Sequence, residues 1–390
     1  MNNDKQKIFI RTFGCQMNVR DSEVVAGLLK AAGYSLVDDE NKADIVIFNT
    51  CSVRQHAEDK VWSAIGHIAK SCRLKPKQKV KKVKPLIGLI GCMAQSYQEH
   101  VFERSTQVDF VVGPSDIAKI PAVIEKLVHK NSDLFKVKVW ETGGQIRPED
   151  IYHTGFYEDS DHAYVVISEG CSNFCSYCVV PYVRGGLHNR NYQDILKEIE
   201  QAVEKGITKL TLLGQNVNAY KSGEVSFVDF LRLVNCVKGL KEFSFLTSHP
   251  RDTSVELFQA MAQCDKLKKN LHLPMQSGSD KILKSMNRGY TRKFYLDLVN
   301  NYRKIIKGGG LTTDIIVGFC GEKTEDFQDT FELVKDVGFD AAYIFKYSPR
   351  PNTEALKWLD DVPKEEKELR HSKILRLQKD ISKDKRQKNE

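Results

Sequence analysis

The sequence predicts an α/β fold in two parts, a doubly wound parallel-sheet domain followed by a partial (β/α)6 barrel. Short Val/Ile-rich segments alternate with helix-like stretches over residues 6–125, a less regular connection covers 126–156, and six further strand–helix units fill 157–350. Residues 351–390 predict a C-terminal helical extension. A chain of 390 residues is long enough to build separate hydrophobic cores for both domains.

Cysteines follow three strands of the first domain. The strands are expected at residues 7–13, 44–50, 86–91 and 109–113, with a helix over Asp21–Ala32. Cys15, Cys51 and Cys92 come directly after the first three strands. Because ligands of open parallel sheets bind at the carboxyl ends of strands, three thiols that are distant in sequence are predicted to form one metal site. Each cysteine alone would more often be a small buried residue.

The residues around these cysteines are expected to form tight turns and hydrogen bonds that support the site. They are Gly14, Asn18, Asn49, Thr50 and Gly91. The remaining cysteines of the chain are expected not to bind metal, although the last of them ends a predicted strand. They are Cys72, Cys236, Cys264 and Cys320.

A second cysteine group opens the second domain. Cys171, Cys175 and Cys178 form a CxxxCxxC array after the apolar run 163–168. An iron–sulfur cube that only transfers electrons takes four cysteines, so three local ligands leave one iron open for another group. A zinc knot is the alternative, but zinc sites favour Cys₄ or Cys₂His₂ sets built from CxxC pairs, and a second CxxC is missing from the sequence. The array therefore favours an iron–sulfur cluster.

The cysteine array resembles that of the radical S-adenosylmethionine (SAM) superfamily, in which the open iron chelates the amino and carboxylate groups of SAM. The barrel strands are expected at residues 163–168, 209–215, 242–248, 271–276, 311–319 and 340–347. Polar residues follow these strands, where barrels collect their chemistry. Candidate SAM contacts are Tyr177 against the adenine, Gly214 for close backbone approach, and Gln215, Ser248, Gln276 and Ser277 for ribose and carboxylate. His249 and His272 are interpreted as structural residues or as residues that support the SAM contacts from behind.

The composition indicates an intracellular protein with positively charged segments that could bind a polyanion. The net charge is +8, and residues 73–84 carry seven positive charges and no acid. This stretch and the basic run 379–388 are either solvated segments or phosphate contacts. The polar N-terminus and the lack of an apolar run near 20 residues predict a soluble, cytoplasmic protein without a membrane span. Ten cysteines without a secretion signal indicate metal or redox chemistry.

Segments in both domains closely resemble the methylthiotransferases of the radical SAM superfamily. The matching segments are 12–23, 49–54, 91–95, 170–183, 213–220, 247–250, 271–280, 286–288 and 314–322. Residues 14–18 and 247–250 resemble the branch that acts on isopentenyladenosine in tRNA. The chain departs from the family at Gly186–Asn189, where acidic and serine residues are usual, and at Cys320, which replaces a proline. It ends at Glu390, where the family continues into a TRAM domain, so this domain is expected to be absent.

The resemblance implies two [4Fe-4S] clusters and SAM as cofactors. Cys171, Cys175 and Cys178 would bind the SAM-cleaving cluster, and Cys15, Cys51 and Cys92 an auxiliary cluster. The implied reaction adds a methylthio group to C2 of N6-isopentenyl(dimethylallyl)adenosine next to the anticodon, whose base leaves the stack. The expected partners are this tRNA, a flavodoxin- or ferredoxin-type reductant and a sulfur donor, with the chain as a monomer.

Three other functions remain open at this stage. Two are enzymatic, since sister branches of the family methylthiolate threonylcarbamoyladenosine in tRNA or an aspartate of a ribosomal protein. The third is non-catalytic, an iron–sulfur redox sensor or RNA-binding protein. It would show no turnover of SAM, which separates it from the enzymes.

Overall fold

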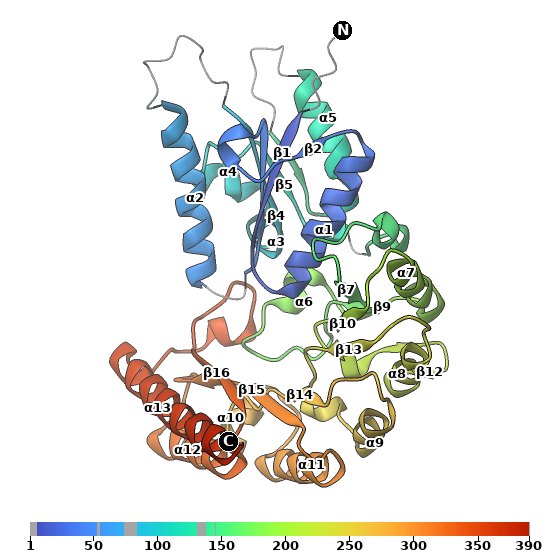
Figure 1. Cartoon of the computed structure of the whole chain (residues 1–390). Helices are drawn as coiled ribbons and strands as arrows, with labels where there is room; N and C mark the ends of the chain where they lie inside the picture. Colours follow the sequence, from blue (N-terminus) through green and yellow to red (C-terminus); the bar gives the residue numbers. More distant parts are fainter. Residues whose placement is uncertain (1–5, 53–54, 74–83, 131–137, 145, 390) are drawn as a thin grey trace. The chain divides into compact units, whose positions relative to one another are not determined.

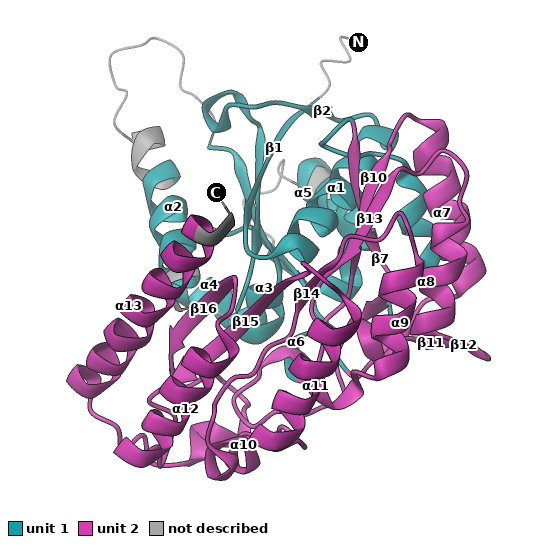
Figure 2. Cartoon of the chain, turned by 60° about the horizontal axis from the view of Figure 1, so that its bottom comes forward, with its two compact units in different colours: residues 1–160, 182–185 teal, residues 161–181, 186–390 magenta. Residues whose placement is uncertain are grey.

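A computed structural model describes residues 6–52, 55–73, 84–130, 138–144 and 146–389 of the chain (Figure 1). The chain forms two compact units, distinguished by colour in Figure 2. Unit 1 contains residues 1–160 together with Tyr182–Gly185, and unit 2 contains residues 161–181 and 186–390. The return of Tyr182–Gly185 to unit 1 was not predicted. The basic stretch noted in the sequence falls mostly at 74–83, outside the described residues.

Unit 1 is built on a six-stranded sheet in which every strand pairing is parallel. In sheet order the strands are β2 (Ser35–Leu36), β1 (Lys7–Phe13), β3 (Ile45–Thr50), β4 (Leu86–Gly91), β5 (Phe110–Val112) and β6 (Val139–Glu141). The parallel sheet and its four predicted strands are confirmed. The strands β2 and β6 were not predicted, because neither contains the run of apolar residues by which β5, of similar length, was recognised.

Helices cover both faces of this sheet, which is the doubly wound arrangement that the sequence predicts. In Figure 1, α1 (Gln16–Ala31) and α5 (Ile120–Lys130) lie on one side and α2 (Gln55–Arg73) on the other. Strand β3 is buried along its whole length, so it reads as a continuous apolar run before Asn49. The shorter helices of the unit are α3 (Cys92–Tyr97), α4 (Val101–Arg104), η1 (Glu40–Lys42), η2 (Gln98–His100), η3 (Pro114–Lys119) and η4 (Glu149–Thr154).

Unit 2 contains six parallel strands in two three-stranded sheets. One sheet has β7 (His162–Val166), β10 (Lys209–Leu213) and β13 (Glu242–Phe245), and the other has β14 (Asn270–His272), β15 (Gly310–Val317) and β16 (Ala341–Lys346). A parallel bridge from Phe243 to Leu267 connects β13 to the segment that leads into β14. The six strands therefore form the partial barrel that was predicted. Two small antiparallel pairs accompany it, β8 (Ser168–Glu169) with β9 (His188–Asn189) and β11 (Lys221–Ser222) with β12 (Val225–Ser226).

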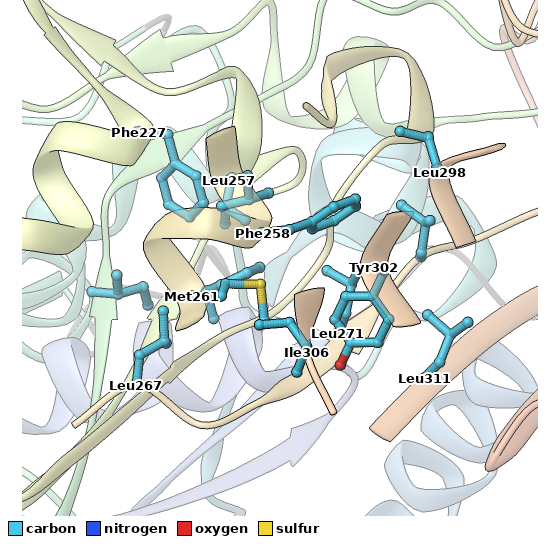
Figure 3. Close-up of a cluster of buried hydrophobic side chains, with 14 of the residues drawn as sticks. Phe227, Leu257, Phe258, Met261, Leu267, Leu271, Leu298, Tyr302, Ile306 and Leu311 are labelled. Atoms are coloured by element: carbon cyan, nitrogen blue, oxygen red, sulfur yellow. The ribbon is translucent and has the colours of Figure 1, made fainter. Parts of the chain in front are cut away.

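Helices alternate with the barrel strands and close a large hydrophobic core. The helices are α6 (Val180–Arg184), α7 (Tyr192–Glu204), η5 (Val217–Ala219), α8 (Phe227–Asn235), η6 (Pro250–Asp252), α9 (Val255–Gln263), α10 (Asp280–Ser285), α11 (Arg292–Ile305), α12 (Thr324–Val337), η7 (Glu354–Lys357) and α13 (Lys364–Asn389). Figure 3 shows the part of the core where Phe258 and Met261 meet Tyr302. The Tyr302 hydroxyl lies 2.8 Å from the Lys269 carbonyl, so its one polar atom is satisfied.

The C-terminal helix α13 completes unit 2 by packing against β16 and α12. Its buried positions, Lys367, Arg370, Ile374 and Gln378, recur every three or four residues and form one face. Arg370 Nη1 donates to Glu322 Oε2 at 2.8 Å inside the protein. The predicted helical extension is thus an integral layer. None of the described helices is both long and apolar enough to cross a bilayer.

A buried ion pair fixes the start of the barrel after the segment that departs from the family pattern. Arg190, which directly follows this segment, is 1% exposed. Its guanidinium donates to Glu198 Oε2 and Asp194 Oδ2, both at 2.6 Å, and to the Val166 carbonyl at 2.7 Å. These contacts join β7 to α7. They do not involve Gly186–Asn189, the residues that depart from the family pattern.

Replacing Arg190 with methionine should therefore destabilise unit 2. The change removes this partner from the buried Glu198 carboxylate, which costs about 3–5 kcal/mol for a buried pair that loses one member. The measurement is the midpoint of urea unfolding. The double variant Arg190→Met/Glu198→Met should recover most of the loss, and the exposed Arg232→Met should change little. An unfolding midpoint of Arg190→Met equal to that of the wild type would contradict this role.

Candidate functional site

The three cysteines of unit 1 lie together at the carboxyl edge of its sheet. Cys15 is two residues beyond β1, and Cys51 and Cys92 directly follow β3 and β4. These strands are neighbours, and Thr50 pairs with Phe13 on one side and with Gly91 on the other. Adjacent strands are about 4.8 Å apart, so the three backbones gather at one place. The predicted placement beyond three neighbouring strands is confirmed.

The topology of the sheet makes this edge a natural binding site. The chain passes from β1 to β2 on one side and then crosses to β3 on the other, so the strand order reverses between β1 and β3. Ligands of open α/β sheets bind outside the carboxyl ends of the strands at such a switch point. Cys15 and Cys51 stand on either side of it, and Cys15 is exposed whereas Cys51 is 7% exposed.

Asparagine side chains hold the three turns in place. The Asn18 amide donates to Asn49 Oδ1 at 3.0 Å and to the Thr50 carbonyl at 3.2 Å, and Asn18 Oδ1 accepts from the Cys15 amide at 3.4 Å. Asn49 in turn donates to the Asn18 carbonyl at 2.8 Å. Gly91 has φ of 90°, and a Cβ there would lie 2.5 Å from Asn49 Oδ1. The predicted supporting bonds are therefore present, and only glycine fits before Cys92.

A buried charge network adjoins Cys92. Arg184 Nε donates to Cys92 Sγ at 3.2 Å, and Arg184 Nη2 donates to Asp21 Oδ2 at 2.7 Å. The other oxygen of Asp21 accepts from Arg147 Nη1, also at 2.7 Å. Burial alone would raise the pKa of Asp21, but the two guanidinium groups hold this pKa below its usual value. Asp21 is therefore ionised and orients Arg184 toward the sulfur.

Burial also acts on the thiol itself. It raises the pKa of Cys92, and the nearby Cys15 raises it further, whereas the Arg184 charge lowers it. A cysteine binds a metal as the thiolate. A bound metal centre and Arg184 would therefore both favour the thiolate form of Cys92, whereas burial disfavours it.

The cysteines of unit 2 lie on one compact loop between β8 and α6. The Cys178 amide donates to the Cys175 carbonyl at 2.9 Å, and Phe174 takes the left-handed φ of 46° that folds the loop back. Burial raises the pKa of the Cys178 thiol to about 12, and the charges of Cys175 and Cys171 contribute to that rise. The three cysteines therefore share one short loop, as the CxxxCxxC spacing predicts.

The part of the chain that the structure describes contains no group of three His, Cys, Asp or Glu side chains arranged around a single metal ion. A four-iron cube binds each of its cysteines through a different iron, so its ligands need not converge on one ion. The donor sets fit such a group in chemistry, because each consists of three cysteines in hydrogen-bonded turns and one sulfur of each accepts a hydrogen bond from an arginine.

Arg288 is the arginine beside the second group of cysteines. It is 4% exposed, and its Nη1 donates to Cys175 Sγ and to Tyr177 Oη, both at 3.3 Å. Nε donates to Tyr290 Oη at 3.1 Å and Nη2 to the Pro274 carbonyl at 3.2 Å. Burial raises the pKa of Tyr177, so its phenol is neutral. The Tyr177 ring stands edge-on to that of Phe319, with 6.3 Å between centroids.

Polar atoms without partners follow three barrel strands. Buried atoms of Gln215, Ser248, His249 and Gln276, here called the polar rim, find no hydrogen-bond partner within the described protein: Gln215 Oε1, Ser248 Oγ, His249 Nε2 and Gln276 Oε1. Buried polar atoms are nearly always hydrogen-bonded, so this set indicates a site for a polar ligand. The backbone is strained at the same place, because Thr247 and Gln276 have φ of 74° and 64°.

The other predicted contacts of the barrel differ in what surrounds them. Gly214 is required for packing, because a Cβ there would lie 2.4 Å from Ser168 Oγ. The Ser277 hydroxyl lies 3.2 Å from that of Thr330 and accepts from the Ser279 amide at 3.2 Å, so it supports the turn. His249 Nδ1 accepts from the Arg251 amide, and burial lowers its pKa to about 2, with Arg288 and Arg251 adding to the effect, so the ring is neutral.

The remaining cysteines and His272 occupy other environments. His272 Nδ1 lies 2.9 Å from Thr312 Oγ1 on the barrel wall. Cys264 is buried in the large core, Cys236 is exposed, and Cys320 packs in a cluster with Tyr347 and the Phe319 ring. Cys72 lies in α2, and its side chain is outside the described residues.

Arg184, Asp21 and Arg288 are the residues beside the cysteines that sequence reasoning missed. All three lie inside or directly beside segments that resemble the methylthiotransferases, at 12–23, 170–183 and 286–288. Their position in or beside these segments was the one sign in the sequence that could have drawn attention to them. Charged residues in such segments are usually assigned to the surface, and only the fold shows that these three are buried.

Profiles of two protein families match the chain. The first, described as "uncharacterized protein family UPF0004", matches residues 7–113, and the second, the radical SAM superfamily, matches residues 165–334. The two matches fall on the sheet of unit 1 and on the barrel of unit 2.

Two solved structures share the fold. The radical SAM methyltransferase TsrM from Kitasatospora setae superposes with a TM-score of 0.62 at 13% identity, over 90% of this chain and 75% of its own. The cobalamin-dependent SAM radical enzyme OxsB gives a TM-score of 0.55 at 12% identity, over 97% of this chain and 56% of its own. At these identities the likeness concerns the fold alone.

Curated relatives extend over nearly the whole chain. The tRNA-2-methylthio-N(6)-dimethylallyladenosine synthase of Clostridium novyi is 42% identical over 96% of this chain and 82% of its own length. The synthases of Syntrophomonas wolfei and Fervidobacterium nodosum are each 43% identical, over 96% and 97% of this chain and over 82% and 84% of their own lengths. The chain therefore belongs to the family of tRNA-2-methylthio-N(6)-dimethylallyladenosine synthases, which are radical SAM methylthiotransferases.

Proposed function

We propose that this chain adds a methylthio group to C2 of N6-isopentenyl(dimethylallyl)adenosine next to the anticodon of tRNA. The observation that carries the proposal is the presence, in each unit, of three cysteines beyond the carboxyl ends of parallel strands. The activity for which the curated relatives are named supports the choice of nucleoside. The reaction takes place in the cytoplasm, because its substrate is tRNA, and the chain acts as a monomer.

In unit 2, Cys171, Cys175 and Cys178 would hold a [4Fe-4S] cluster. When bound, this cluster supplies an electron to SAM and an open iron for the amino and carboxylate groups of SAM. The polar rim would form hydrogen bonds with the other polar groups of SAM, because its buried atoms have no partner among the described residues. The neutral His249 adds polarity there without adding charge.

Tyr177 and Gly214 complete the proposed SAM site. Tyr177 is held by Arg288 and Phe319, so its ring is fixed beside the cysteine loop, where it would lie against the adenine. Gly214 has no side chain, so the backbone of the turn after β10 would be able to approach SAM closely. Ser277 acts one step further away, because its hydroxyl shapes the turn that carries Gln276.

In unit 1, Cys15, Cys51 and Cys92 would hold an auxiliary [4Fe-4S] cluster. When bound, it supplies a site at which sulfur can be carried to the substrate. Asn18 and Asn49 keep the three turns in register, and Asp21 orients the arginine that contacts Cys92. A sulfur donor and a flavodoxin- or ferredoxin-type reductant are the other partners that this chemistry requires.

Replacing all three cysteines of one unit should separate two steps of the reaction. The variant Cys15→Ala/Cys51→Ala/Cys92→Ala should fall from about eight irons per chain to about four and still release 5′-deoxyadenosine with dithionite, but should make no methylthio product. The corresponding variant at Cys171, Cys175 and Cys178 should lose the release of 5′-deoxyadenosine as well. The exposed Cys236→Ala is the matched control and should keep both activities. Unchanged iron in the first variant would refute the auxiliary site.

Truncation of Ser248 should weaken the binding of SAM. One lost hydrogen bond is worth about 1 kcal/mol, so Ser248→Ala should raise the dissociation constant for SAM about fivefold at unchanged iron content. Equilibrium binding to the reconstituted chain measures this. The exposed Ser160→Ala should bind like the wild type. Equal affinity in Ser248→Ala would remove this hydroxyl from the proposed SAM site.

The choice of nucleoside is tested in cells. A strain that lacks its own synthase should regain 2-methylthio-N6-isopentenyladenosine when it carries this chain, and mass spectrometry of digested tRNA detects the gain. A gain on threonylcarbamoyladenosine, or on a ribosomal protein, would assign the chain to a sister activity instead. The Cys175→Ala variant is the negative control.

A further inference from the structure

Each cysteine group contains one sulfur that accepts a hydrogen bond from a buried arginine. In unit 1, Arg184 Nε lies 3.2 Å from Cys92 Sγ, and in unit 2, Arg288 Nη1 lies 3.3 Å from Cys175 Sγ. Arg184 is 6% exposed and Arg288 is 4% exposed. A hydrogen bond from a buried arginine to a cysteine sulfur therefore occurs once in each unit, although the two units have different folds.

Arg288 is a buried cation whose contacts lack a carboxylate. Its hydrogen bonds go to two phenols, one backbone carbonyl and Cys175 Sγ, and among the described residues Arg288 forms no ion pair. Arginine cannot give up its proton in a protein, and a buried charge is stable only when an opposite charge compensates it. Cys175 Sγ and the phenols of Tyr177 and Tyr290 are the side-chain groups that accept its hydrogen bonds. An anionic group bound by the neighbouring cysteines would therefore compensate the charge of Arg288.

Arg184 is held by a carboxylate, unlike Arg288. Asp21 accepts from its Nη2 at 2.7 Å, and Arg147 holds the other oxygen of Asp21 at 2.7 Å. Arg147 Nε in turn donates to the Pro114 carbonyl at 3.1 Å. This chain of bonds directs Arg184 Nε toward Cys92 Sγ and leaves it little rotational freedom.

We propose that Arg184 and Arg288 are positioning residues that set the reduction potential of the iron–sulfur cluster held by the cysteines of their own unit. The proposal rests on the proposed function for the presence of the clusters. A four-iron cluster with three thiolate ligands is anionic, and its negative charge grows when it takes up an electron. A hydrogen bond to a ligand sulfur and a nearby buried cation both stabilise the reduced form more than the oxidised form, so each arginine raises the potential.

The test uses redox titration followed by electron paramagnetic resonance, with one cluster present at a time. The full chain with Cys171, Cys175 and Cys178 replaced by alanine keeps only the unit 1 cluster. The full chain with Cys15, Cys51 and Cys92 replaced keeps only the unit 2 cluster. A charge-assisted hydrogen bond is worth about 1.5–3 kcal/mol, so a loss of at least about tenfold in the reduction equilibrium is expected, or about 59 mV for one electron.

The expected result is a crossed pattern. Arg184→Gln lowers the potential of the unit 1 cluster and leaves that of unit 2 unchanged, whereas Arg288→Gln does the reverse. Arg184→Lys and Arg288→Lys keep the charge and lose the fixed geometry, so they shift the potential less. Where a glutamine variant fails to assemble its cluster, the lysine variant and its spectrum decide. Arg232→Gln, at an exposed ion pair, shifts neither potential.

Unchanged potentials in variants that contain a full cluster would overturn the inference, as would equal shifts of both clusters by either substitution. Failure of the proposed function looks different. In that case no cluster assembles on the cysteines of one unit even when Arg184 and Arg288 are both present, and iron analysis of the two parent variants shows this before any arginine is changed.

Discussion

The parallel pairing of neighbouring strands is the constraint on which both candidate sites depend. In unit 1, β1, β3 and β4 run side by side in register, so the residues that follow them share one edge although they are far apart in sequence. In unit 2 the same rule places the ends of β10, β13 and β14 on the rim of the barrel. A change that shifted any of these strands by one residue would turn its last side chain to the other face.

Burial and charge then decide what the cysteines can do. Removal from water raises the pKa of Cys92 and of Cys178, so both thiols resist ionisation in the folded protein. A metal centre requires them as thiolates, and the positive charge of Arg184 lowers the pKa of Cys92 against desolvation. Arg184 therefore partly offsets the burial that disfavours the thiolate form of Cys92.

The sequence allowed the architecture and the six cysteines to be predicted because those signals are local. Val/Ile-rich strands, the cysteines that follow them and the CxxxCxxC loop can each be recognised within about ten residues of chain. The strands β2 and β6 were missed because they are short and contain no run of apolar residues. Arg184 was missed because its partners, Cys92 and Asp21, are 92 and 163 residues away.

The polar residues of the barrel illustrate the same limit. Gln215, Ser248 and Gln276 were selected because they follow strands, and each has a buried atom without a partner. Ser277 was selected for the same reason, yet its hydroxyl is used by Thr330 and Ser279. Position after a strand therefore identifies the rim, whereas the contacts made across the fold decide which of its side chains are available to a ligand.

Mössbauer spectroscopy of the chain reconstituted with ⁵⁷Fe, recorded with and without SAM, is the most direct measurement of the central claim that the two groups of three cysteines hold two clusters, one of which keeps an iron open for SAM. The account predicts about eight irons in two [4Fe-4S] clusters and, on addition of SAM, a changed signal from one iron of one cluster. A spectrum with a single cluster, or one in which SAM alters none of the iron signals, would contradict it.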